Sequence, residues 1–295
     1  GLRPSTPAAA VRCEMMNRAQ FLADPAVGSF LDWAEPLVSG DRSLVHSWQD
    51  GRGRSFSCRS LADAYANYRW PFQVTLPGDA STRRGSSFSD SATMLAQLSH
   101  GLRAAVIADA PDSFCDYAVA VLEWGGTTSH NATWLRTRTP AELRRVMSVA
   151  GYLSPSEVDT FQLPDIPRLN AGFTKIYSML VDGFIIFDSR VAAALAALIR
   201  IFADHADLVA IPLPLRIALP PGRAGVRHVP GFPLAVAGSS GIPAFASSNI
   251  RASWLVGEMA QRGRFADVSS ELRGRALEAA LFMIGYTVSD LRVGY

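Results

Sequence analysis

Two residues in the middle of the chain are of types that could perform covalent catalysis: Lys175, and Asp188 13 residues later. Lys175 is the only lysine among the 28 lysine and arginine residues. Arginine can replace a lysine that serves only as a positive charge, but a guanidinium does not deprotonate in a protein and cannot act as a neutral amine. A GC-rich genome accounts for most of this bias, and a surface lysine in a helix is the alternative to a candidate nucleophile.

The sequence around these residues indicates how they are positioned. Asn170-Ala171-Gly172 is a small-residue turn that opens a helix, with Lys175 in its first turn. The positive end of the helix dipole and an apolar setting both disfavour the ammonium form, so we expect a lowered pKa and a usable amine nucleophile. The apolar run at residues 184–187 leads to Asp188, a predicted helix N-cap. A fixed carboxylate beside an amine can stabilise an oxocarbenium ion, although Asp188 could also be a plain cap.

The segment at residues 168–191 resembles the helix-hairpin-helix DNA glycosylase superfamily, most closely its 8-oxoguanine glycosylase branch. In that branch the hairpin is Gly-Val-Gly-Thr-Lys and a Val-Asp pair follows it. In this chain the hairpin is Ala171-Gly-Phe-Thr-Lys175, and an apolar run leads to Asp188. Ala171 and Phe173 replace the two glycines, and the spacing from lysine to aspartate is shorter here. The chain is less directly similar to bacterial proteins of the same fold that act on modified bases in phage DNA. It has too few cysteines for the four-cysteine cluster of the iron–sulfur branch.

The resemblance implies a DNA glycosylase that excises a damaged or modified base from double-stranded DNA, in base excision or anti-phage defence. Lys175 would attack C1′ of an extruded nucleotide and form a Schiff base, with associated lyase activity, and Asp188 would assist base departure and deprotonate the amine. No metal or organic cofactor is implied. The other implied site residues are the phosphate-binding hairpin Asn170, Ala171, Gly172, Phe173 and Thr174; Asn131 or His130 as gap filler or reader of the opposite base; Arg190 as a phosphate ligand; and Trp124 or Trp254 stacked on the base.

Two alternatives belong to other classes of protein. A non-catalytic helix-hairpin-helix DNA-binding protein would keep the hairpin without the chemistry, and the two missing glycines favour it. A lysine-dependent Schiff-base enzyme on a small carbonyl substrate would show no affinity for DNA and no steep salt dependence.

Composition narrows the class of protein further. The 295 residues are 48% hydrophobic and 18% charged, which excludes a disordered chain. A net charge of +2 permits nucleic-acid binding without requiring it. Three dispersed cysteines, Cys13, Cys58 and Cys115, argue against a disulfide framework, and the histidines lack metal-site spacing. No apolar run is long enough to span a bilayer and no signal peptide is evident, so we expect a cytoplasmic monomer.

The predicted fold is mostly α, a helix-hairpin-helix glycosylase-like arrangement with few short strands. We divide it into an N-terminal helical and loop region (1–89), a helical core with the hairpin (90–210), and an extended crossing segment with C-terminal helices (211–295). Strands are expected at 72–76 and 183–187, and loops at 39–59, 77–89 and 123–135. Helices are expected at 18–37, 60–68, 90–107, from Asp112 to Gly125-Gly126, from a Thr139 capping box, twice within 168–203, at 248–261 and at 270–286.

Overall fold

The computed structural model describes residues 16–153, 163, 165–222, 226–236, 238–263, 265 and 268–294, which leaves Cys13 outside the described residues. Helices dominate these residues, so the prediction of a mostly α fold is confirmed. The helices are α1 (Arg18–Ala23), α2 (Pro25–Ser39), α3 (Leu61–Ala66), α4 (Phe88–Ile107), α5 (Pro111–Trp124), α6 (Thr128–Arg136), α7 (Pro140–Tyr152), α8 (Phe173–Leu180), α9 (Ser189–His205), α10 (Ile242–Arg262) and α11 (Arg273–Ile284), with 3-10 turns at Leu213–Leu215, Ser239–Gly241 and Ser270–Leu272.

Five short strands form two small antiparallel sheets. Strand β1 (Leu44–Gln49) lies between β2 (Ser55–Cys58) and β5 (Arg292–Val293), and β3 (Phe72–Thr75) pairs with β4 (Thr82–Gly85). The expected strand at 72–76 is therefore confirmed, whereas the expected loops at 39–59 and 77–89 are wrong because they contain β1, β2 and β4. In β1, buried and exposed residues alternate strictly, but Val45 is exposed and His46 is buried, so this alternation does not coincide with an apolar–polar pattern in the sequence.

Local sequence signals predicted the start of α7 but misplaced the starts of α4 and α10. Thr139 forms the expected capping box with Glu142 at the start of α7. Helix α4 starts two residues earlier than expected, because Ser87 is its N-cap and Asp90 completes the capping box from inside the helix. Helix α10 starts at Ile242 rather than near Ser248, because Pro243 is accommodated in its first turn. The expected loop at 123–135 is wrong, since α6 occupies most of it.

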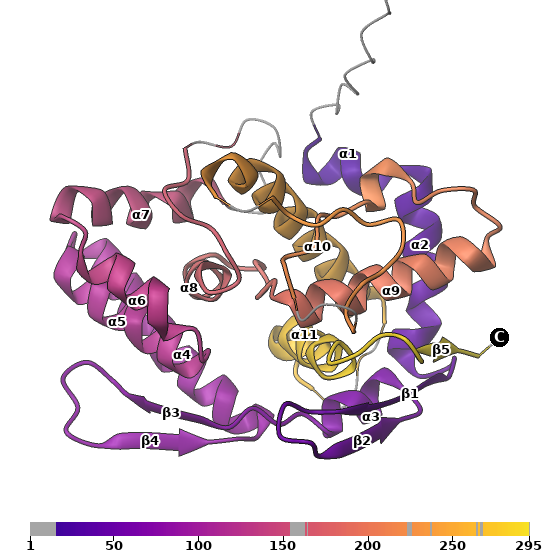
Figure 1. Cartoon of the computed structure of the whole chain (residues 1–295), viewed down its shortest axis with the longest axis horizontal. Coiled ribbons are helices and arrows are strands. Elements are labelled where there is room, and N and C mark those ends of the chain that lie inside the picture. The colour runs from indigo at the N-terminus through magenta and orange to yellow at the C-terminus, as the bar shows by residue number, and fades with distance from the viewer. Residues whose placement is uncertain are drawn as a thin grey trace, which may run out of the picture.

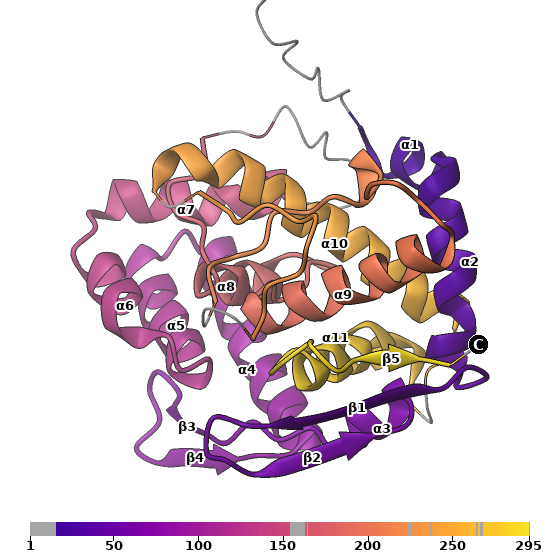
Figure 2. The same ribbon diagram turned by 45° about the vertical axis from the view of Figure 1, so that its right-hand side comes forward.

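The first and last parts of the chain pack together. Helix α2 contacts α10, α3 contacts α11, and β1 pairs with β5, so residues 16–89 and the C-terminal helices share one hydrophobic core. Figures 1 and 2 show α8 between the group α4–α7 on one side and α9–α11 on the other. Among the described residues, no helix combines the length and apolarity needed to cross a membrane.

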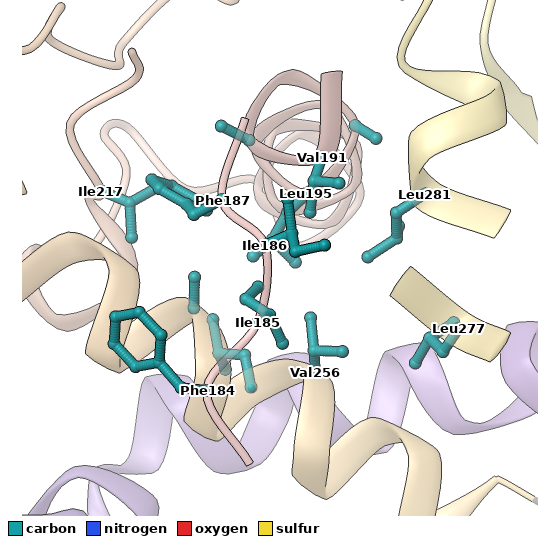
Figure 3. Packing of buried hydrophobic residues seen from close by; sticks show 14 of the residues in the cluster. Phe184, Ile185, Ile186, Phe187, Val191, Leu195, Ile217, Val256, Leu277 and Leu281 are labelled. Atoms are coloured by element: carbon teal, nitrogen blue, oxygen red, sulfur yellow. The ribbon is translucent and has the colours of Figure 1, made fainter. Parts of the chain in front are cut away.

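The segment at residues 184–187 follows a turn at Gly183 and pairs with no strand among the described residues, so the strand expected at 183–187 is wrong. Side chains satisfy its backbone instead: the amides of Ile185, Ile186 and Phe187 donate to Ser253 Oγ, Glu278 Oε2 and Thr174 Oγ1 at 3.1, 2.9 and 3.3 Å. Figure 3 shows the four apolar side chains of this segment packed among α9, α10 and α11. This packing fixes the path of the chain into Asp188.

Candidate active site

Lys175 lies in the first turn of α8, as predicted. Asn170 starts this turn, because its Oδ1 accepts hydrogen bonds from the amides of Gly172 and Phe173 at 2.9 and 3.1 Å. The Lys175 side chain is 4% exposed, and its Nζ donates to the carbonyl of Ala171 at 3.0 Å. A Cβ at Gly125 would collide with Cδ and Cε of Lys175, so this glycine leaves the space that the lysine stem occupies.

The pKa of the Lys175 amine is lowered toward neutral pH. Burial lowers its pKa from 10.5 to about 8, and the nearby Asp188 carboxylate limits the drop. With such a pKa about a tenth of the amine is free at pH 7, far more than for an ordinary lysine, so Lys175 is a competent nucleophile.

Asp188 is the N-cap of α9, as predicted. Its Oδ1 accepts hydrogen bonds from the amides of Arg190 and Val191 at 2.8 and 3.1 Å. Its Oδ2 accepts from Nε and Nη2 of Arg190 at 3.1 and 2.8 Å. Burial alone would raise the pKa of Asp188, but the charges of Arg190 and Lys175 and these hydrogen bonds hold it at about 2. The carboxylate is therefore ionised at any physiological pH.

Arg190 is fixed by an aromatic cluster. Its guanidinium carbon lies 3.8 Å from the ring centre of Phe282, 5.1 Å from that of Trp70 and 5.2 Å from that of Tyr286. Its Nη1 also donates to the Tyr286 hydroxyl at 3.3 Å. The sequence indicated Arg190 only as a phosphate ligand, whereas in the structure its first role is to pair with and orient Asp188.

Lys175 and Asp188 both line one cavity of about 370 Å³. Its walls are largely aromatic and apolar, and they come from distant parts of the chain. The cavity also contains an acidic group, Glu278. The aromatic side chains that line it are Tyr68, Trp70, Phe88, Trp124, Phe184 and Phe282.

The two tryptophans proposed for a base pocket have different positions. Trp124 lines the cavity, and its indole N–H has no hydrogen-bond partner among the described residues. Trp254 does not line it: this residue is 1% exposed and packs in the core with its ring centre 5.2 Å from that of Phe21. The prediction for Trp254 is corrected on this ground, because a side chain enclosed by the core has no face left for a ligand.

Asn131 lies in α6 and binds the hairpin. Its Oδ1 accepts hydrogen bonds from Nε and Nη2 of Arg168, both at 3.1 Å, and from Asn170 Nδ2 at 3.0 Å. A Cβ at Gly172 would collide with Asn131 Nδ2, which explains a glycine in the turn. The structure thus gives Asn131 a role in holding the hairpin, whereas its neighbour His130 is exposed and does not line the cavity.

The hairpin is largely satisfied within the molecule. Beyond the Gly172 and Phe173 amides, which bind Asn170 Oδ1, the Thr174 amide donates to the Asn170 carbonyl at 2.9 Å. Thr174 Oγ1 donates to the Ala171 carbonyl at 3.0 Å. The described residues just before the turn, 165–169, are not helical. These features position Lys175 well, but they leave few hairpin amides for a phosphate.

Among the cavity residues that sequence reasoning missed are Trp70, Glu278 and Phe282. Glu278 is 8% exposed, and its Oε2 accepts from the amide of Ile186 and from Arg275 Nη1, both at 2.9 Å. Burial raises its pKa against the opposing charge of Arg275. A lone acidic residue inside the apolar run of α11 was an available signal for Glu278. Trp70 and Phe282 had no such signal.

No cluster of three or more metal-ligating side chains occurs in the part of the chain that the structure describes. Its two cysteines, Cys58 and Cys115, are free thiols, and neither lines the cavity. Comparisons of the chain with protein-family models, with curated proteins and with solved structures found no match. A functional assignment therefore has to come from the chemistry of the site.

Proposed function

We propose that this protein is a DNA glycosylase that excises a damaged or modified base through a Schiff base on Lys175. One observation carries the proposal: the only lysine of the chain is buried with a pKa of about 8 and shares an aromatic-walled cavity with an ionised, rigidly held aspartate. An amine with a lowered pKa and a fixed carboxylate that share one cavity are typical of catalytic sites.

The two side chains match the charge changes of glycosidic cleavage. The free amine of Lys175 attacks C1′ of an extruded nucleotide, and the bond from C1′ to the base breaks with its electron pair leaving on the base, which takes up a proton. Positive charge that develops on the sugar is stabilised by the Asp188 carboxylate. The amine then loses a proton, the sugar ring opens and a Schiff base forms. Water hydrolyses it, or loss of a C2′ proton breaks the 3′ C–O bond.

The pKa of Asp188 refines its proposed role. A carboxylate whose pKa is about 2 is a weak base and holds almost no proton near neutral pH. Its best use is electrostatic, as a fixed negative charge beside C1′, and it accepts a proton only from the acidic secondary ammonium that forms after the attack.

The cavity suits a flipped base. Its volume of about 370 Å³ is within the usual range of small-ligand pockets. Aromatic walls offer stacking surfaces, which flipping enzymes use to hold a base outside the duplex. Glu278 would supply a polar contact to the edge of the base.

A second candidate is a Schiff-base enzyme that acts on a small carbonyl compound. The internally bonded amides of Gly172 and Phe173 favour it, because they weaken the case for a phosphate clamp at the hairpin. The same finding counts against a non-catalytic module that binds DNA through this hairpin. The two enzyme candidates differ in whether a DNA duplex or a small carbonyl compound traps the amine.

Borohydride trapping tests the proposal. The protein is incubated with labelled duplexes that carry 8-oxoguanine, uracil, an abasic site or a hypermodified cytosine, then reduced and run on a denaturing gel, while released bases are measured by mass spectrometry. We expect a covalent adduct and base release with at least one duplex, and neither with Lys175→Gln or Lys175→Arg. Trapping by small aldehydes or ketoacids but by no duplex would favour the second candidate.

A further inference from the structure

A large open groove lies next to the cavity and is rich in arginine. Its volume is about 1290 Å³, and it is lined by the β1–β2 hairpin, by the chain before β3, by the start of α9 and by the residues after α11. Among the described residues that line it, Asp50 is the only acidic one. The five arginines on its walls are Arg52, Arg54, Arg69, Arg190 and Arg227.

The single acidic residue leaves the groove positive. The carboxylate of Asp50 is already bonded within the turn between β1 and β2. Its Oδ1 accepts hydrogen bonds from the amides of Arg52 and Arg54 at 2.8 and 3.0 Å, and its Oδ2 forms an ion pair with the Arg54 guanidinium at 2.6 Å. It therefore neutralises one of the five arginines and fixes the turn that carries them. The groove keeps an excess of positive charge, although the chain as a whole is nearly neutral.

Two of the arginines are available to a partner. Arg52 and Arg69 are exposed, and within the described residues neither side chain has an ion-pair or hydrogen-bond partner. Arg190 and Arg227 are instead held in place, since Arg190 pairs with Asp188 and Arg227 Nη1 donates to Ser189 Oγ at 2.8 Å. The groove thus combines fixed guanidinium groups, those of Arg190 and Arg227, with free ones, those of Arg52 and Arg69.

Aromatic rings lie between the arginines. Phe56 is partly exposed and stacks on the buried Trp48, with ring centres 5.7 Å apart, and the Arg54 guanidinium lies 5.8 Å from the ring centre of Phe56. Trp70 and Tyr286 also line the groove. Guanidinium forks bind phosphate oxygens bidentately, and aromatic faces stack on bases, so this mixture fits a nucleic-acid strand better than a purely acidic peptide.

The groove and the cavity share two walls, because Trp70 and Arg190 line both. We propose that this groove binds the phosphodiester backbone of the DNA strand that carries the target nucleotide. The base of the target nucleotide would pass Trp70 and Arg190, which line both the groove and the cavity, to reach Lys175. This inference rests on the proposed function. It assigns backbone binding mainly to the β1–β2 hairpin and Arg69 rather than to the amides of the turn at Asn170–Gly172.

The salt dependence of DNA binding tests the proposal. Binding of the full chain to a labelled duplex with a tetrahydrofuran abasic analogue, which cannot form a Schiff base, is measured by fluorescence anisotropy over a range of salt concentrations. The test variant is Arg52→Ala with Arg69→Ala. A matched control, Arg84→Ala with Arg136→Ala, removes the same charge from two exposed arginines that do not line the groove.

We expect the test variant to bind roughly tenfold or more weakly, and the slope of log K against log salt to become shallower by about 2, because two phosphate contacts are lost. The control should change both quantities far less. Equal effects in the two variants, or an unchanged slope in the test variant, would overturn the groove assignment. Because this duplex cannot react, the result is independent of trapping: a failure of the wild-type protein to form any adduct rejects the Schiff-base chemistry alone.

Discussion

The surroundings lower the pKa of both Lys175 and Asp188, which favours the neutral amine of one and the ionised carboxylate of the other. Burial drives the amine toward its neutral form, while the Arg190 guanidinium keeps the carboxylate ionised. Both effects have consequences for stability as well as for chemistry, because a pKa that differs between the folded and unfolded states makes the free energy of unfolding depend on pH.

Replacing Lys175 with methionine should stabilise the protein near neutral pH. Its pKa falls from 10.5 unfolded to about 8 folded, so burying the ammonium costs up to about 3 kcal/mol. Losing the hydrogen bond to Ala171 returns about 1 kcal/mol of that, for a net gain of roughly 2 kcal/mol.

The unfolded state binds more protons between these two pKa values, so wild-type stability rises with pH across that window and the advantage of Lys175→Met shrinks. Urea unfolding near pH 7 and near pH 10 measures this. A variant that is less stable than wild type near pH 7 would contradict a lowered pKa at Lys175.

Replacing Asp188 with asparagine keeps a capping side chain but removes its charge. The folded pKa of Asp188 is depressed from 3.8 to about 2, which corresponds to about 2 kcal/mol of stability that is present above pH 4 and lost as the pH falls toward 2. Asp188→Asn should therefore be less stable by about that amount near neutral pH and no less stable near pH 2. Chemical unfolding at several pH values checks this, and a pH-independent difference would show that the pairing with Arg190 is not its source.

At the scale of elements, the site depends on how α6 and the end of α5 hold α8. Asn131 on α6 receives three hydrogen bonds from Arg168 and Asn170, and Gly125 at the end of α5 leaves room for the Lys175 stem. Neither residue touches the presumed reacting atoms, so both act by positioning.

Removing Asn131 should loosen the hairpin. In Asn131→Ala the Arg168 guanidinium and the Asn170 amide lose their common acceptor, which should cost about 1–3 kcal/mol. The exposed His130 on the same helix provides a matched control, and His130→Ala should be nearly neutral. Thermal unfolding compares the two, and equal losses of stability would mean that Asn131 does not secure the hairpin.

An added methyl group at Gly125 should displace the amine more than it destabilises the fold. The backbone of Gly125 has a φ of −78°, which alanine adopts freely, so the main effect of Gly125→Ala is the collision with the flexible stem of Lys175. We expect the rate of adduct formation to fall about tenfold or more with little change in melting temperature. Gly28→Ala, where an added Cβ meets nothing within 4 Å, is the control; an unchanged rate in Gly125→Ala would show that Lys175 does not need this space.

At the scale of the whole molecule, the cavity collects residues from the beginning, middle and end of the chain. Lys175 and Asp188 could be predicted because their positions follow from local turn and cap chemistry within one short segment. Trp70 and Phe282 could not, because Trp70 precedes β3 and Phe282 lies on α11, and their rings meet, with centres 5.5 Å apart, only in the folded chain. Trp254 was misplaced for the same reason: the sequence of α10 does not show which of its faces meets α1.

The fold, like the site, could be predicted where the signal is local in the sequence. Thr139 and its capping box marked the start of α7, since that signal lies within four residues. The strand β1 was missed because its alternation is recognisable only once its partners β2 and β5, the latter far along the chain, are known. The path of residues 184–187 was also misread, because its amides bind side chains instead of a neighbouring strand.

Mapping the attachment point of a borohydride-reduced DNA adduct tests the central claim most directly. The wild-type protein is trapped on the best duplex of the panel, digested, and its cross-linked peptide is identified by mass spectrometry. We expect the modification on Lys175, and none when Lys175→Arg is treated in parallel. An adduct on another amine, such as the terminal one, or base release that persists in Lys175→Arg would contradict a mechanism in which this lysine attacks the sugar.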